Sequence, residues 1–186
     1  FATALADELS AVGVTLNFAP VLDLYDESAD PVIGARALSS DPATVSRLGR
    51  VIIEGFQSNG IAACAKHFPG HGDTGVDSHR ELPVIEHSPE HLREKEMAPF
   101  RAAIAGEVAA VMTAHVLYPA LDEEHPASLS QTVVNEILRG ELGHRGLVVT
   151  DDLDIAVAVP IVRVAIDARM TQEEPSVGTA MLLSNG

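Results

Sequence analysis

In several stretches of the chain apolar residues recur every three or four positions, which is the spacing of an amphipathic helix. In the first stretch Leu5, Leu9 and Val12 fall on one face, and Gly13 follows as a plausible C-cap. Capping residues mark where later helices begin: an Asp-Pro pair at 41–42, a Ser-Pro pair at 88–89, and Ser130. The predicted helices therefore cover residues 1–12, 41–59, 88–106, 130–143 and 161–168.

Continuous apolar runs separate these helices and predict strands that are buried on both faces. The runs cover residues 14–22, 61–66, 107–115, 147–150 and 181–183. Because strands and helices alternate, we expect a parallel α/β sheet. A doubly wound sheet and a (β/α)8 barrel both fit this order of elements.

Polar side chains with reactive groups follow successive predicted strands: Asp23, Lys66-His67, His115 and Asp151. A ring of such residues from many strands is typical of a barrel, whereas an open sheet concentrates its ligand site at one switch point. We therefore expect a TIM-type (β/α)8 barrel, of which about five β/α units can be counted. On this interpretation residues 1–186 form a single, partial barrel domain that lacks its N-terminal strands.

The composition narrows the classes of partner. The chain has 186 residues, 46% of them hydrophobic, and a formal net charge of −15. A field of that sign repels phosphate backbones, so nucleic acid is not an expected partner, whereas a neutral sugar is compatible. No apolar run approaches the roughly 20 residues of a membrane span. The single cysteine, Cys64, excludes an intrachain disulfide and is expected in the core. The oligomeric state stays open.

The densest polar cluster is the run KHFPGHGDTGVDSH, residues 66–79. Asp77 and His79 lie two residues apart, so in an extended loop their side chains point the same way. The carboxylate would then fix the tautomer of the ring and raise its pKa, which suits a proton donor working near neutral pH. The glycines of the run allow the loop to deform, and we expect it to close over a substrate and open for release.

Two other interpretations of this run stay open. A metal site could use any of five candidate ligands, but their spacing matches no pattern that a helix or tight turn enforces: His67, His71, Asp73, Asp77 and His79. A polar surface loop without chemistry would explain the glycines and aspartates. It explains less well why the loop leaves a buried strand with Lys66-His67.

Asp151 and Asp152 follow the apolar run 147–150 directly. A carboxylate immediately after a buried barrel strand projects into the mouth of the barrel. Either Asp could instead cap the next helix. Both roles can hold together, with one Asp capping and the other reacting.

Five segments together resemble glycoside hydrolase family 3, closest to its β-N-acetylhexosaminidase branch, the NagZ-like enzymes. They are NFAPVLDL (17–24), VIGARAL (32–38), KHFPGHG with DSH (66–79), AHVLYP (114–119) and TDDL (150–153). The resemblance covers about residues 1–155, and the pair KHFPGHG and DSH is its most specific part.

The resemblance implies a retaining exo-β-N-acetylglucosaminidase that hydrolyses terminal β-linked N-acetylglucosamine from glycans such as peptidoglycan fragments. Asp151 would be the nucleophile, and His79 the general acid/base with Asp77 as its partner. Hydroxyls of the sugar in the −1 subsite would be bound by Lys66, His67 and Arg36. The resemblance implies no metal or organic cofactor. We expect a cytoplasmic enzyme, or a secreted or lipoprotein form if an upstream signal has been removed.

The chain departs from the family in three places. Nothing in it matches the DQEGG-like motif of an earlier strand, whose Asp grips the sugar. Residues 160–168 and 178–186 resemble the final helix and strand of the family, but the segment RMTQEEPSV between them is extra. Asp154 stands where the family often has a small residue. A β-glucosidase, a phosphorolytic variant of the family and a truncated sugar-binding homologue without turnover therefore remain as alternatives.

Overall fold

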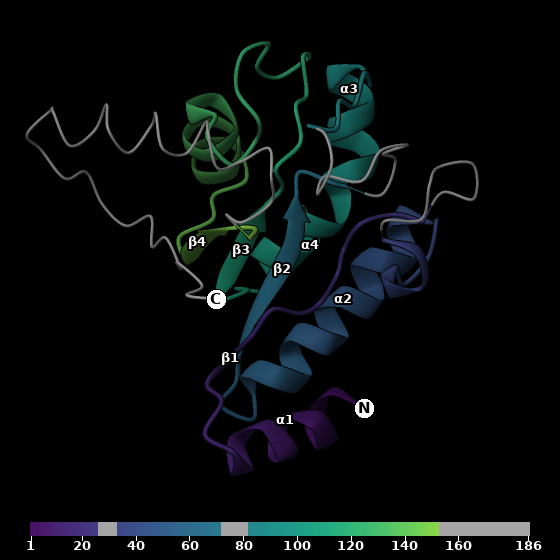
Figure 1. Ribbon diagram of the computed structural model, residues 1–186. Helices are drawn as coiled ribbons and strands as arrows, with labels where there is room; N and C mark the ends of the chain where they lie inside the picture. Colours follow the sequence, from purple (N-terminus) through teal and green to yellow (C-terminus); the bar gives the residue numbers. More distant parts are fainter. Residues whose placement is uncertain (26–32, 72–81, 153–186) are drawn as a thin grey trace, which may run out of the picture.

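The computed structural model describes residues 1–25, 33–71 and 82–152, and shows a parallel sheet with helices packed against it (Figure 1). The sheet has four strands in the order β1-β2-β3-β4, all parallel to their neighbours. Their bounds are Leu16–Asn17 (β1), Ala62–Phe68 (β2), Ala110–Thr113 (β3) and Leu147–Thr150 (β4). The predicted parallel α/β sheet is confirmed. A doubly wound sheet reverses its strand order at a switch point, and the described strands show no reversal.

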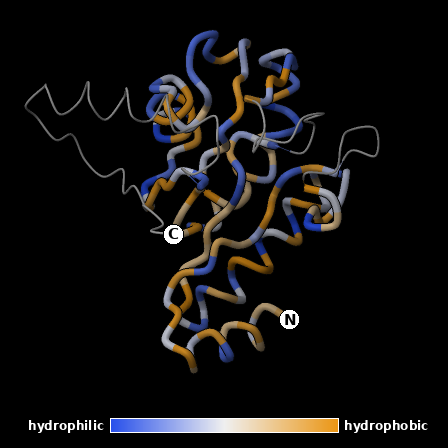
Figure 2. The backbone as a smooth tube through the Cα atoms, in the orientation of Figure 1, coloured by the Kyte–Doolittle hydropathy of each residue, from blue (hydrophilic) through white to orange (hydrophobic). Residues whose placement is uncertain are grey.

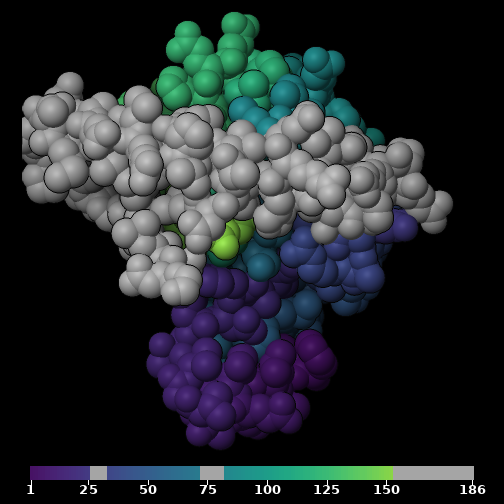
Figure 3. Space-filling model, in the orientation of Figure 1, coloured from purple at the N-terminus to yellow at the C-terminus, as the bar shows by residue number. Residues whose placement is uncertain are grey.

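Helices alternate with these strands along the chain. They are α1 (Ala2–Ala11), the 3-10 turn η1 (Gly34–Arg36), α2 (Pro42–Gln57), α3 (Pro89–His91), η2 (Leu92–Glu96), α4 (Ala98–Ala105) and η3 (Thr132–Glu141). Helix α2 packs against β2 and against both α1 and α4. The C-terminal ends of the strands point toward α3 and away from α1, which with the other N-terminal residues forms one end of the molecule (Figures 1 and 3).

The predicted helix starts are confirmed by their capping hydrogen bonds. The Asp41 carboxylate accepts from the backbone N–H of Thr44 at 2.9 Å, and the hydroxyls of Ser88 and Ser130 accept from N–H groups three residues later. The first helix ends at Ala11. The predicted helix at 161–168 and strand at 181–183 lie outside the described residues.

Four elements differ from their predictions; one of them is the helix expected at 130–143, where the structure has the π-type helix η3. Val12 does not share the inner face of α1 but is 76% exposed, because the helix ends one residue earlier. The strand expected at 14–22 is reduced to the short β1 and an isolated bridge at Val21. Pro20 interrupts the strand because it has no N–H to donate to the hydrogen-bond ladder. The helix expected at 88–106 contains the π-type turn η2. Pro99 follows it, and a proline both lacks an N–H and clashes with the carbonyl four residues earlier.

The core lies on both faces of the sheet, in a large and a small cluster of buried residues. Figure 2 shows the hydrophobic stretches of the chain in orange. On the helix side, the rings of Phe68 and Phe100 meet edge to face with centroids 5.3 Å apart. On the opposite side a smaller cluster comprises Cys64, Ala110, Met112 and Val149. Cys64 is fully buried, as expected, and this burial raises the pKa of its thiol to about 12. Among the helices of the described residues, none is long and apolar enough to span a membrane.

The turn before β4 depends on a glycine. A Cβ at Gly146 would overlap the carbonyl oxygen of Ala109 and lie 2.8 Å from the His144 ring. We expect Gly146→Ala to lower the free energy of unfolding by about 1–3 kcal/mol, since backbone must move to admit the methyl group. Gly106→Ala is the matched control, because a Cβ there meets atoms only at 3.4 Å or more. Urea unfolding measures both, and equal losses for the two variants would contradict the packing described for this turn.

Candidate active site

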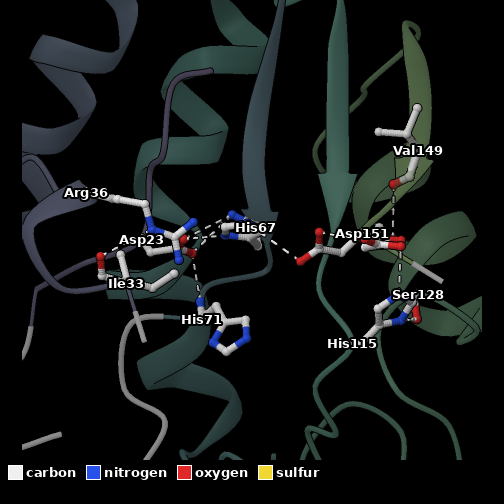
Figure 4. Close-up of polar contacts among 11 residues, drawn as sticks. Asp23, Ile33, Arg36, His67, His71, His115, Ser128, Val149 and Asp151 are labelled. Atoms are coloured by element: carbon white, nitrogen blue, oxygen red, sulfur yellow. Dashed lines mark hydrogen bonds and ion pairs between the residues drawn. The ribbon is translucent and has the colours of Figure 1, made fainter. Parts of the chain in front are cut away.

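The strand ends bring polar side chains together at one edge of the sheet (Figure 4). Asp23 follows β1 and the bridge at Val21, His67 lies in β2, His115 follows β3, and Asp151 follows β4. Because the strands are parallel, their carboxyl ends meet at the same edge, as the sequence predicts. The β2–β3 register shifts between Ala65 and Phe68, the segment that carries His67. In the view of Figure 4 the ring of His67 lies between Asp23 and Asp151.

Asp23 is a fully buried carboxylate whose oxygens are occupied by hydrogen bonds from the β2 end. Oδ2 lies 2.7 Å from Nδ1 of His67, while Oδ1 accepts from the backbone N–H of His67 at 3.1 Å and of His71 at 2.8 Å. Burial alone would raise the pKa of Asp23. The charge and hydrogen bond of His67, together with the His71 contacts, outweigh it and hold the pKa below its ordinary value. Asp23 is therefore an ionised group inside the protein.

His67 connects this buried carboxylate to the more accessible Asp151. Its Nε2 lies 3.7 Å from Oδ2 of Asp151. The side chain of His67 is 5% exposed, whereas that of Asp151 is 25% exposed. The imidazole thus forms part of the wall of the site, and the Asp151 carboxylate remains reachable for a small molecule.

Asp151 is held from both its backbone and its side chain. Its N–H donates to the carbonyl of Thr113 at 3.1 Å, which extends the β3–β4 pairing by one residue. Its carbonyl lies 3.1 Å from Nε2 of His115, and its Oδ1 accepts from the N–H of Asp152 at 2.9 Å. Oδ1 is therefore anchored locally, and Oδ2 is the oxygen that faces His67.

His115 supports Asp151 as a neutral ring. A backbone carbonyl only accepts, so the Nε2 of His115 carries the hydrogen of that contact. Its Nδ1, 2.7 Å from the hydroxyl of Ser128, then accepts from that hydroxyl. Burial lowers the pKa of His115 despite the nearby carboxylates, which agrees with this tautomer near pH 7.

The loop that leaves β2 is fixed at its root. The Tyr118 hydroxyl donates to the carbonyl of Gly70, and burial raises the pKa of this tyrosine, so it keeps its proton. Gly70 has φ +140°, and a Cβ there would lie 2.7 Å from Oε2 of the buried Glu96. Both its backbone angle and the space beside it therefore require glycine.

Only some of the residues predicted for the site are among those that the structure describes. Lys66 and His67 are consecutive residues of β2, the first half-buried and the second buried. Arg36 ends η1, is exposed, and donates from Nε to the carbonyl of Ile33 at 3.4 Å. Asp77 and His79 lie outside the described residues.

The sequence interpretation missed two supporting roles. It noted Asp23 and His115 as polar residues at strand ends but gave neither of them a partner. Asp23 binds His67, and His115 binds the backbone of Asp151. Their position at parallel strand ends, and within the family-like segments NFAPVLDL and AHVLYP, is the sequence signal that could have marked them.

Comparison with known proteins adds to this geometry. The sequence matches the family described as glycosyl hydrolase family 3 N terminal domain over residues 1–184. The chain belongs to glycosyl hydrolase family 3. A β-hexosaminidase of Thiobacillus denitrificans is 45% identical over 170 residues, which are 88% of this chain and 47% of that protein.

Solved structures agree with this membership. A family 3 β-N-acetylglucosaminidase from Paenibacillus sp. shares 52% identity and a TM-score of 0.81, over 83% of this chain and 30% of that one. Zn-bound CbsA from Thermotoga neapolitana shares 36% identity and a TM-score of 0.84, over 99% of this chain and 39% of that one. This family 3 chain thus spans less than half the length of each of these relatives.

The Thermotoga protein binds zinc, which bears on the interpretation of the run 66–79 as a metal site. Within residues 1–25, 33–71 and 82–152, no group of three or more His, Cys, Asp or Glu side chains is arranged to hold a metal ion. Asp23 and His67 are already bound to one another, and the ring of His71 lies 5.8 Å from that of His67. Of the five candidate ligands, Asp73, Asp77 and His79 lie outside the described residues.

The buried histidines give the fold a pH dependence. Burial lowers the pKa of His71, His115 and His144 below 6.5. As the pH falls through about 6.5, the unfolded chain takes up protons that the folded protein does not bind, so the free energy of unfolding decreases as the pH decreases. We expect the free energy of unfolding to decrease between pH 7.5 and 5.5, by at most about 1.4 kcal/mol per pH unit for each group. Urea unfolding across this range measures it.

His144→Gln is the control for this effect, because it removes one proton-linked group away from Asp151. We expect its stability to depend less steeply on pH than that of the unmodified protein. A free energy of unfolding that stays constant or rises toward pH 5.5 would contradict the assignment of neutral buried rings.

Proposed function

We propose that this chain is the catalytic part of a retaining exo-β-N-acetylglucosaminidase, which releases terminal β-linked N-acetylglucosamine from glycans such as peptidoglycan fragments. Family membership and relatives named β-hexosaminidase and β-N-acetylglucosaminidase support a glycosidase of this type. The observation that carries the proposal is the placement of Asp151. Its carboxylate leaves a buried strand, is anchored through Oδ1, and presents Oδ2 beside His67 at a partly exposed position.

In the proposed reaction Asp151 is the nucleophile. A carboxylate oxygen bonds to the anomeric carbon as the bond from that carbon to the leaving oxygen breaks, and His79 gives its proton to that oxygen. Water then attacks the glycosyl-enzyme, returns a proton to His79 and frees the Asp151 carboxylate. Asp77 is proposed to orient the His79 ring and stabilise its charged form.

The sugar in the −1 subsite is proposed to be bound through its hydroxyls by Lys66, His67 and Arg36. Lys66 and His67 are consecutive residues of β2, and Nε2 of His67 lies 3.7 Å from the Asp151 carboxylate. Arg36 is exposed at the end of η1, and Figure 4 draws it on the Asp23 side of the same group of residues. The three would thus approach the sugar from the side opposite β4.

We further propose that residues 1–186 belong to a single (β/α)8-type barrel domain, of which this chain supplies a part. The described strands follow one another in chain order without a switch point, and both faces of the sheet are apolar. Consecutive parallel neighbours with helices between them are the arrangement of a barrel wall.

Other members of the same chemical class would use the same nucleophile. A β-glucosidase would turn over an aryl β-glucoside better than the N-acetylglucosaminide, and a phosphorolytic enzyme would need phosphate. We propose hydrolysis without metal or organic cofactor. The zinc named for the Thermotoga relative keeps a metal-dependent hydrolase as the competing proposal, and loss of activity on chelation, with recovery on added zinc, would favour it.

Substitution of the nucleophile tests the proposal directly. We expect Asp151→Ala to reduce kcat for an aryl β-N-acetylglucosaminide by about 10³-fold or more, because no glycosyl-enzyme can form. Asp152→Ala is the control, since the Asp152 side chain is exposed and the contact to Asp151 comes from the Asp152 backbone N–H, which alanine keeps. Steady-state assays in the intact protein measure both variants, and comparable turnover by the two would overturn the assignment.

The acid role of His79 predicts a dependence on the leaving group. An activated phenol needs little proton assistance, whereas an alkyl or sugar leaving group needs the full proton transfer. We expect His79→Ala to slow glycan hydrolysis at least about 10²-fold more than hydrolysis of a nitrophenyl substrate. Equal losses on the two substrates would contradict the role.

A further inference from the structure

Asp23 takes no direct part in the proposed reaction, but it binds the ring of His67, whose other nitrogen faces Asp151. A carboxylate taken out of water is costly unless its oxygens are satisfied. Asp23 is fully buried, and the hydrogen bonds that its oxygens accept from the described residues come from His67 and His71. The protein therefore maintains an ionised group directly behind the ring that faces Asp151.

We propose that Asp23 is a positioning residue for the nucleophile and acts through the ring of His67. The inference rests on the proposed function, in which Asp151 attacks the sugar. An ionised carboxylate only accepts hydrogen bonds, so the Nδ1 of His67 carries the hydrogen shared with Oδ2 at 2.7 Å. This contact fixes the orientation of the ring and leaves Nε2 as the nitrogen that faces Asp151.

One carboxylate, that of Asp23, holds both the ring and the backbone of His67. Asp23 binds the backbone N–H of His67 as well as Nδ1, so both the chain and the imidazole of this residue are held by the same group. The hydrogen bond from His71 N–H holds the following turn to the same oxygen. A ring held in this way cannot rotate without breaking the contact to a buried charge.

The fixed orientation of the His67 ring determines which nitrogen faces Oδ2 of Asp151. Its partner oxygen Oδ1 is anchored by the N–H of Asp152, so Oδ2 faces the Nε2 of His67, 3.7 Å away. Nε2 therefore borders the space in which the attacking oxygen and the sugar meet. Attack requires the reacting atoms within a few tenths of an ångström of their productive separation, so a tilted ring would cost rate even with every reacting group present.

A purely structural role for Asp23 is the alternative, and a double-mutant cycle separates the two. Asp23→Asn keeps an oxygen for the backbone N–H groups, but its amide nitrogen cannot accept from Nδ1. We expect kcat for an aryl β-N-acetylglucosaminide to fall on the order of 10²-fold, with a smaller change in KM. In a His67→Ala background the same substitution should cost less than about twofold, because its path of action is gone.

Two outcomes of this cycle would overturn the proposal. One is an Asp23→Asn enzyme with unchanged kcat. The other is a loss in the His67→Ala background as large as in the parent, which would mark a structural role. Asp7→Asn on the exposed face of α1 is the matched control for loss of one carboxylate and should leave kcat unchanged.

A spectroscopic measurement on the unmodified protein holds even if Asp23→Asn fails to fold. Nitrogen-15 NMR of the His67 ring, assigned by its loss in His67→Ala, should place a hydrogen on Nδ1. A neutral ring with its hydrogen on Nε2 alone would overturn the proposal. Asp151→Ala in the same kinetic assay keeps the two claims apart: full turnover there would refute the nucleophile, while the NMR result would still report on Asp23 and His67.

Discussion

The buried contact between Asp23 and His67 joins the ends of two neighbouring strands, and the remaining geometry of the site is arranged around it. A carboxylate inside the protein must be matched by donors, and here the donors come from the end of β2 and the start of the following loop. This requirement fixes the path of the chain where it leaves the sheet. The side chain that faces Asp151 is thereby set in place by the folding of β1 against β2.

The other half of the site is built by the same means from β3 and β4. The Asp151 N–H continues the strand pairing to Thr113, and His115 holds the Asp151 carbonyl from β3. Reactive groups thus stand on rigid strand ends, and each is supported by a residue from the neighbouring strand. The root of the loop after β2 is held in a comparable way by Tyr118 and Glu96, beside a glycine that no other residue could replace without displacing them.

Much of the fold could be predicted because its signals are local. Helix caps such as Asp41 use hydrogen bonds within a few residues, and the apolar run at 147–150 coincides with β4. Prolines caused the main errors in the elements: Pro20 shortens β1, and Pro99 follows the π-type turn in a helix expected to be continuous. Periodicity alone does not reveal how a chain accommodates a missing N–H.

The site could be predicted only in part. Strand-end position marked Asp151 and His67 correctly as neighbours at one edge, and the family resemblance supplied their proposed roles. The pairing of Asp23 with His67 spans 44 residues and depends on the register of two strands, so no local pattern encodes it. Asp77 and His79 lie outside the described residues, and their role as proton donor remains a proposal.

The most direct test of the central claim is to trap the covalent intermediate. A fluorinated N-acetylglucosaminide with an activated leaving group forms the glycosyl-enzyme faster than water can release it. After proteolysis of the labelled intact protein, mass spectrometry should find one added sugar on the peptide that contains Asp151, and none in the Asp151→Ala variant. A label on a different residue, or turnover of the reagent without a trapped sugar on Asp151, would contradict the assignment of this carboxylate as the nucleophile.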